Sequence, residues 1–60
     1  MLSNLLDEKE AAVVLNCSVA FLRRCRLFRT GPRFAKIGRL VRYRTQDLLG
    51  YIESSMARAA

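Results

Sequence analysis

Apolar and polar residues follow two different periods along the chain, and the change of period divides it into predicted helices and strands. The first helix is expected to begin at Asp7, an N-cap residue that forms a capping-box pattern with Glu10, three residues later. Its apolar face is narrow and partly built of small residues that allow close helix packing: Ala11, Ala12, Val14 and Leu15. Asn16 tolerates the left-handed conformation that commonly ends a helix, so we expect the helix to end there.

A second helix is predicted after a turn of three or four residues, 15–18, with Ser18 as its N-cap. Its buried face has apolar residues at positions i, i+3 and i+6, flanked by two aromatic residues: Val19, Leu22 and Cys25, with Phe21 and Phe28. The opposite face carries small and basic side chains next to one leucine: Ala20, Arg23, Arg24 and Leu27. Residues 30–32 contain Gly31 and Pro32 and are expected to end this helix.

Two short segments with a period of two follow, residues 34–37 and 41–44, and they predict a β-hairpin. The turn between them, residues 38–40, contains Gly38. One face of the hairpin is expected to pack inward: Phe34, Val41 and Tyr43, with either Ile37 or Lys36. The arginines would then point outward, and the pattern leaves the register open.

A third helix is predicted from the N-cap candidate Thr45, with Asp47 in its first turn. Its apolar stripe has the spacing i, i+3 and i+4, with one further residue at the margin: Leu48, Tyr51 and Ile52, with Leu49. The stripe is lost after Glu53, so residues 54–60 are expected to fray.

These elements predict a mainly α fold with a small β-hairpin, in the order helix, turn, helix, hairpin, helix. That order is typical of a compact winged helix-turn-helix, in which the two-stranded hairpin is the wing. We expect one domain over residues 1–60, with an ordered core at about 5–53.

Charge is sorted by sign along the chain. The segment from Arg23 to Arg44 holds no acidic residue and nine basic ones: Arg23, Arg24, Arg26, Arg29, Arg33, Lys36, Arg39, Arg42 and Arg44. All five carboxylates lie outside it: Asp7, Glu8, Glu10, Asp47 and Glu53. With a net charge of +6 on 60 residues, such sorting favours a polyphosphate partner. The alternative is a solvated basic face with no partner.

The composition argues against several classes of protein. The chain has no His and no Gly-rich phosphate loop, and helix capping explains the carboxylates, so we expect no enzymatic activity. Cys17 and Cys25 are too few for an ordinary zinc site and are expected to be free thiols rather than a disulfide, so no metal or cofactor is expected. The longest apolar run, residues 11–15, is too short to span a bilayer, and residues 1–6 do not form a signal peptide. We therefore expect a cytoplasmic, nucleoid-associated protein without membrane contact.

Nearly the whole chain, from about Leu5 to Ile52, is similar to a known family. The motifs that carry the similarity are residues 5–12 (LLDEKEAA), 15–18 (LNCS), 30–34 (TGPRF), 36–39 (KIGR), 41–44 (VRYR) and 47–48 (DL). They resemble the AlpA-like and excisionase-type regulators of phages and mobile elements, which are small MerR-like winged helix-turn-helix proteins. Four positions depart from the usual pattern of Gly, Val, a hydroxyl residue and an aromatic: Asn16, Cys17, Phe21 and Cys25.

The resemblance implies sequence-specific binding to double-stranded DNA, with a recognition helix in the major groove and the wing on the adjacent minor groove or backbone. The recognition helix would present Ser18, Ala20, Arg23 and Arg24. Its two arginines would either read guanine or contact phosphate alone. The wing and backbone contacts would come from Lys36, Arg39, Arg42 and Arg26. Arg44 would either contact DNA or pair with Asp47, whereas Asp7 and Glu8 would repel phosphate from the first turn of the first helix.

The residues leave the biological role open between a transcriptional regulator and an excisionase, that is, a recombination directionality factor. One small module covers few base pairs, so further copies on adjacent sites or an integrase are expected partners. Outside this family, the same basic surface would suit a non-enzymatic protein-interaction adaptor or a general nucleic-acid binder, including an RNA binder. RNA is disfavoured because all five aromatic residues are expected in the core, which leaves no exposed platform for base stacking.

Overall fold

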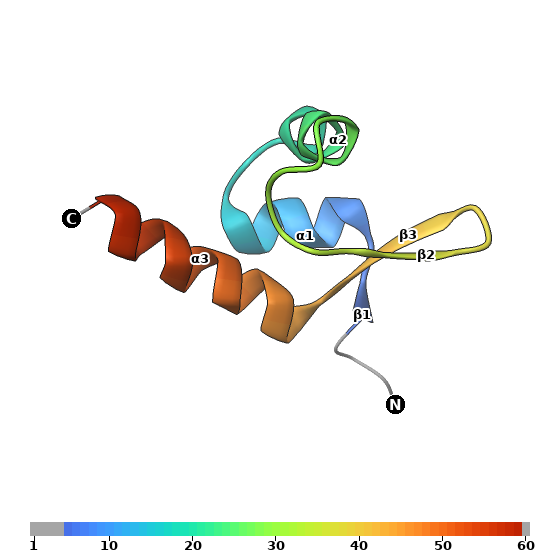
Figure 1. The fold of residues 1–60 in the computed structure, drawn as a ribbon. Coiled ribbons are helices and arrows are strands. Elements are labelled where there is room, and N and C mark those ends of the chain that lie inside the picture. The colour runs from blue at the N-terminus through green and yellow to red at the C-terminus, as the bar shows by residue number, and fades with distance from the viewer. Residues whose placement is uncertain (1–4, 60) are drawn as a thin grey trace.

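The computed structural model describes residues 5–59 and contains three helices and a small three-stranded antiparallel sheet (Figure 1). In chain order the elements are β1 (Leu5–Leu6), α1 (Glu8–Leu15), α2 (Val19–Leu27), β2 (Ala35–Ile37), β3 (Leu40–Arg44) and α3 (Thr45–Ala59). Helix α1 lies in the middle, between α2 and α3, while the β2–β3 hairpin and the end of α3 project in opposite directions (Figure 1). The three helices and the hairpin occur in the predicted order, with a hairpin turn one residue shorter than the expected 38–40, and β1 was not predicted.

The start of α1 has the predicted capping box. The Asp7 carboxylate accepts a hydrogen bond of 2.8 Å from the Glu10 backbone N–H, and the Glu10 carboxylate accepts one of 2.9 Å from the Asp7 backbone N–H. At the other end, Asn16 has a φ of 54° in the left-handed region, which confirms its predicted role. Two local signals therefore fix both ends of this helix.

Helix α2 begins and ends close to the predicted positions. The Ser18 hydroxyl accepts a hydrogen bond of 3.0 Å from the Phe21 backbone N–H, so it is the N-cap. After the helix, Arg29 adopts a φ of 58° and the Thr30 backbone N–H donates 2.8 Å to the Cys25 carbonyl. Gly31 follows with a φ of 78°, and a Cβ there would lie 2.7 Å from the Cys25 Cβ. The loop backbone thus fills the space beside this small core residue.

The β2–β3 hairpin has a two-residue turn at Gly38 and Arg39, because Ile37 pairs directly with Leu40. Gly38 has a φ of 65°, which suits the first central position of such a turn. Lys36 pairs with Val41 and therefore shares its face, whereas Ile37 lies on the other face and is half exposed. The register thus puts Lys36 on the face of Val41 and Tyr43, but all three residues of β2 are exposed, so neither Lys36 nor Ile37 packs inward as expected.

Strand β1 adds a third strand to the sheet and makes β3 central, in the order β1-β3-β2. Leu5 pairs with Arg44, and Leu6 pairs with Tyr43. Only two residues form this strand, so the sequence offers no alternation by which it could be recognised. The strand ends at the N-cap of α1 and so ties the start of that helix to the sheet.

The core is smaller and less aromatic than predicted. The buried cluster consists of Ala11, Ala12, Leu22, Tyr43 and Leu48. Of the three phenylalanines none is buried, since Phe21, Phe28 and Phe34 are 42%, 63% and 40% exposed. The expectation that all five aromatics lie in the core was therefore wrong. The alanines of α1 let the other elements approach closely, which leaves little room for further rings.

Helix α3 runs through Ala59, so the expectation that the chain frays after Glu53 was wrong for residues 54–59; Ala60 lies outside the described residues. Thr45 is its first helical residue, and Leu48 on its first turns is fully buried. The stretch after Glu53 lacks an apolar stripe but contains Met56 and alanines, which have high helix propensity. The high helix propensity of these residues thus extends α3 beyond the turns that pack against the core.

Candidate nucleic-acid interface

A groove of about 390 Å³ lies between the first turn of α1, the exposed side of α2 and the tip of the hairpin. Its lining residues are Asp7, Glu8, Lys9, Arg23, Arg26, Arg39, Leu40, Val41 and Arg42. Five of these side chains are cationic and two are anionic. Residues from three elements, distant in the sequence, are therefore gathered around one concave basic surface, which we call the basic groove.

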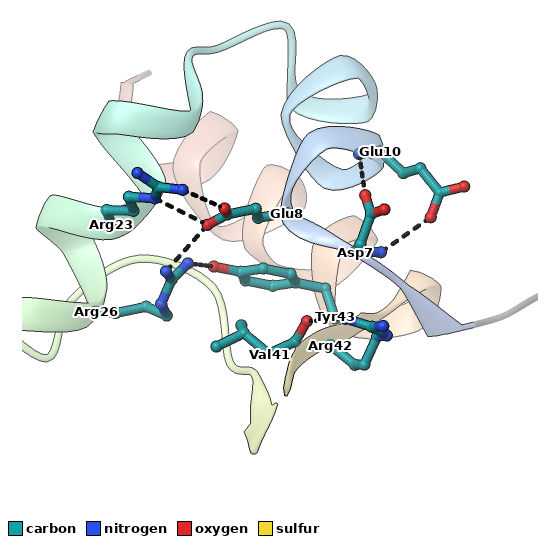
Figure 2. A network of polar contacts seen from close by, with 8 residues as sticks. All are labelled: Asp7, Glu8, Glu10, Arg23, Arg26, Val41, Arg42 and Tyr43. Carbon is teal, nitrogen blue, oxygen red and sulfur yellow. Dashed lines mark hydrogen bonds and ion pairs between the residues drawn. The ribbon is translucent and has the colours of Figure 1, made fainter. Parts of the chain in front are cut away.

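Glu8 lies at the centre of the polar contacts in this groove (Figure 2). Its Oε2 accepts 2.7 Å from Arg23 Nη2, and its Oε1 accepts 3.2 Å from Arg23 Nε. The same Oε1 also accepts 3.0 Å from Arg26 Nη2. One carboxylate therefore holds two guanidinium groups of α2 against the start of α1.

Arg26 lies partly buried against the edge of the core. Its Nη1 donates 2.7 Å to the hydroxyl of the fully buried Tyr43, and its guanidinium lies 5.8 Å from the centroid of the Phe34 ring. The side chain is 18% exposed, whereas that of Arg23 is 65% exposed. Of the two arginine side chains that Glu8 holds, Arg23 therefore has more freedom to move than Arg26.

The charges of this network shift its pKa values. The hydrogen bond from Arg23 lowers the pKa of the Glu8 carboxyl most strongly; burial opposes the shift and Arg26 adds to it, so the pKa falls from 4.5 to about 2. The hydrogen bond with Glu8 raises the pKa of Arg23 in turn. Burial works against the charged form of Arg26, but its bonds to Tyr43 and Glu8 outweigh this and raise its pKa. All three groups are therefore charged at neutral pH.

The residues predicted for the recognition helix do not share one environment. Ala20 and Arg24 are exposed on α2, and Arg24 has no ion-pair partner within residues 5–59. The Ser18 hydroxyl is occupied by helix capping, and Arg23 is held by Glu8. Arg24 is thus the predicted base reader that the rest of the described chain leaves available.

The predicted wing residues lie on both faces of the hairpin. Arg39 is at the exposed tip, and Arg42 lines the basic groove while its Nη1 donates 2.8 Å to the Val41 carbonyl (Figure 2). Lys36 is exposed on the face that it shares with Val41 and does not line the basic groove. Contacts of these three side chains with DNA stay predictions.

Arg44 forms an ion pair with Asp47. Its Nε donates 2.9 Å to Oδ2 and its Nη2 donates 3.2 Å to Oδ1. The hydrogen bond from Arg44 lowers the pKa of the Asp47 carboxyl. The structure thus shows the pairing that the sequence left as one of two alternatives, and it joins the end of β3 to the first turn of α3.

Most of the basic segment stays without a counter-charge. Of its nine basic side chains, Arg23, Arg26 and Arg44 pair with carboxylates. The other six have no ion-pair partner in the part of the chain that the structure describes: Arg24, Arg29, Arg33, Lys36, Arg39 and Arg42. This excess leaves a strongly positive surface around α2 and the hairpin.

The network of Glu8, Arg23, Arg26 and Tyr43 was not foreseen from the sequence. Its members are separated by 15, 17 and 18 positions, so no local spacing rule connects them. From the sequence, Glu8 was interpreted only through its place at the start of a helix and its repulsion of phosphate, and Arg26 as a contact to the DNA backbone. The structure instead places Arg26 half buried beside Tyr43.

The described residues contain neither a disulfide nor a cluster of metal ligands. Cys17 and Cys25 are free thiols, and burial raises the pKa of the Cys17 thiol, with a smaller contribution from Cys25. No group of three or more metal-ligating side chains occurs within residues 5–59. Over the same residues, no helix has the length and hydrophobicity needed to span a membrane.

Comparison with known proteins gives no assignment, because no protein-family model matches this chain and no curated protein is significantly similar to it in sequence.

Proposed function

We propose that this protein binds double-stranded DNA as a small winged helix-turn-helix and serves as a transcriptional regulator or excisionase of a phage or mobile element. The observation that carries the proposal is the basic groove, in which cationic side chains of α1, α2 and the hairpin converge beside the exposed face of α2. A duplex backbone presents a continuous line of phosphates that suits such a surface.

The order of the elements supports this arrangement. The residues between α1 and α2 number three, 16–18, and the hairpin follows α2 at the other side of the basic groove. In the proposed complex the exposed face of α2 enters the major groove, and Arg24 reads a guanine. Arg39, at the hairpin tip, contacts the adjacent backbone or minor groove, and Arg42 supports it.

Counter-charge separates the proposed contacts from the structural arginines. Arg26 donates hydrogen bonds to Glu8 and Tyr43, and Arg44 forms an ion pair with Asp47. We therefore assign these two arginines to the fold rather than to DNA. Arg24 and Arg39 have no such partners within the described residues. A module of this size covers few base pairs, and we propose that further copies on adjacent sites or an integrase complete the functional assembly.

A salt titration of duplex binding tests the electrostatic part of the proposal. Arg39→Ala is expected to make the dependence of log K on log salt shallower by about one unit for every sequence. Arg33→Ala is the matched control, because it removes one positive charge from a residue outside the basic groove. Equal slopes for the two variants would remove Arg39 from the contact set.

A selection from random duplexes tests the base-reading part. Arg24→Ala is expected to weaken binding to the preferred sequence by about 1–3 kcal/mol and to relax the preference at one base pair. A variant that selects the same sequences as the wild-type protein would contradict the role of Arg24.

One observation favours a second candidate function, the binding of single-stranded RNA. Phe28 and Phe34 are exposed, and Phe34 lines a second hollow of about 500 Å³ together with Arg29 and Arg33. Exposed rings beside arginines are able to stack on unpaired bases. Tighter binding to single-stranded RNA than to duplex DNA, lost in Phe34→Ala, would select this function over the first.

A further inference from the structure

Glu8 is an unexpected residue to find in a surface that binds phosphate. The other carboxylate of the basic groove, Asp7, caps α1 through the Glu10 backbone N–H. Glu8 has no role in that capping box; its side chain turns toward α2 and is 22% exposed (Figure 2). A carboxylate in this position opposes the approach of a duplex unless it serves a purpose in binding.

The contacts of Glu8 occupy the Nε–Nη2 edge of Arg23, one of the two edges through which its guanidinium can bind a phosphate. Arg23 presents its Nε and Nη2 to the two carboxylate oxygens in the fork geometry, at 3.2 and 2.7 Å. Arginine binds phosphate and carboxylate through the same fork. A phosphate oxygen therefore binds this face of Arg23 only after Glu8 has released it.

The two arginines held by Glu8 differ in what else fixes them. Arg26 also donates to the Tyr43 hydroxyl and lies against the Phe34 ring, so it stays in place without Glu8. Arg23 makes no other side-chain hydrogen bond within the described residues and is 65% exposed on the open side of α2. Glu8 is thus the only described residue that holds the Nε–Nη2 edge of the Arg23 guanidinium.

We infer that Glu8 is a specificity-determining residue, which restrains Arg23 and so withholds one phosphate contact from duplexes of random sequence. The inference rests on the proposed function. A phosphate contact strengthens binding to every sequence alike and adds nothing to discrimination. By keeping Arg23 on the wall of the basic groove, Glu8 lowers the affinity for random DNA and leaves the reading of bases to Arg24.

Two substitutions of Glu8 separate restraint from charge. Glu8→Gln removes the charge, whereas Glu8→Asp keeps it on a side chain shorter by one methylene, which is expected to break the contacts with Arg23 and Arg26. The control is Glu53→Gln, which adds the same net charge at an exposed residue of α3 outside the basic groove. Binding to a random duplex is measured over a range of salt concentrations, and far-UV circular dichroism checks that each variant is folded.

In both Glu8 variants, Arg23 is no longer held by a carboxylate and is expected to make one additional phosphate contact. We expect both Glu8 variants to bind the random duplex roughly three- to tenfold more tightly at low salt, with a slope of log K against log salt that is steeper by about 0.9. Glu53→Gln is expected to keep the wild-type slope. Adding Arg23→Gln to Glu8→Gln is expected to abolish the gain, because Glu8 acts through Arg23.

Each contrary result has a definite meaning. A steeper slope in Glu8→Gln with a wild-type slope in Glu8→Asp would show an effect of net charge and overturn the restraint. A gain that persists without Arg23 would overturn it too, as would loss of the folded state in both variants, which would assign Glu8 to folding. Wild-type protein that binds no duplex at all would refute the proposed function itself, before any variant is compared.

Discussion

The hydroxyl of Tyr43 offers a test of how much the polar network contributes to the fold. Tyr43→Phe removes a single oxygen from a fully buried side chain and leaves the ring, and hence the packing of the core, in place. The missing oxygen is the acceptor for Arg26 Nη1 at 2.7 Å. The substitution therefore takes one partner from a charged group without creating a large cavity.

The expected loss of folding stability depends on which partners Arg26 keeps after the substitution. A hydrogen bond to a charged group contributes about 1.5–3 kcal/mol, and we expect the lower end, about 1.5 kcal/mol, because Arg26 keeps its bond to Glu8 and is 18% exposed to water. A domain of this length has a total stability of roughly 3–9 kcal/mol. The thermal midpoint should accordingly fall by roughly 6–12 °C.

The assay is thermal and urea unfolding followed by far-UV circular dichroism. Tyr51→Phe is the matched control, because Tyr51 is half buried on α3 and its hydroxyl makes no hydrogen bond with any described residue. The control should change the stability by less than about 0.5 kcal/mol. An equal change in both variants would show that the bond between Arg26 and Tyr43 does not stabilise the fold, which would refute the reasoning.

Three further predictions concern stability. Leu22→Ala should cost roughly 2–5 kcal/mol, because Leu22 is fully buried between the helices, and a loss below about 1 kcal/mol in urea unfolding would contradict its place in the core. Arg29→Gly should stabilise the protein by about 0.5–1 kcal/mol in the same assay, because Arg29 has a φ of 58°; a lower midpoint would count against strain there. The lowered pKa of Glu8 means that its contribution is complete above pH 4.5 and is lost as the pH falls toward 2, so the thermal midpoint should drop over that range and Glu8→Gln should flatten the drop. A midpoint that rises on acidification would contradict this assignment.

The parts of the fold that were predicted correctly depend on signals close together in the sequence. The capping box of Asp7 and Glu10 and the N-cap Ser18 each involve residues three positions apart, so the side chain and its backbone partner meet as soon as the helix forms. Gly38 marks the hairpin turn for a similar reason, since the turn needs a positive φ at that residue. Such features require no knowledge of the tertiary structure.

The parts that were missed depend on contacts between distant segments or on a balance between them. Strand β1 exists because Leu5 and Leu6 find a free edge of β3, and two residues carry no period of their own. The Glu8 network joins the start of α1 to α2 and β3 across 15 or more positions. The aromatic residues were placed inside on hydrophobicity alone, whereas the small core leaves the three phenylalanines partly exposed.

The candidate site was foreseen in outline only. The sequence located the positive charge between Arg23 and Arg44, but it did not show which arginines are already paired. Pairing is decided by side-chain geometry: Arg44 is held by Asp47, three positions away, and Arg23 by Glu8, fifteen positions away. Only the first of these pairs was considered from the sequence.

A footprint of the purified protein on the DNA that flanks its own gene tests the central claim most directly. It is made at about 150 mM salt, where screening weakens diffuse charge attraction, and in the presence of excess random duplex. The proposed function predicts protection of short repeated sites, and their position at a promoter or an attachment site would separate a regulator from an excisionase. Diffuse protection that disappears as random duplex is added would contradict sequence-specific binding and leave the basic groove as a general phosphate-binding surface.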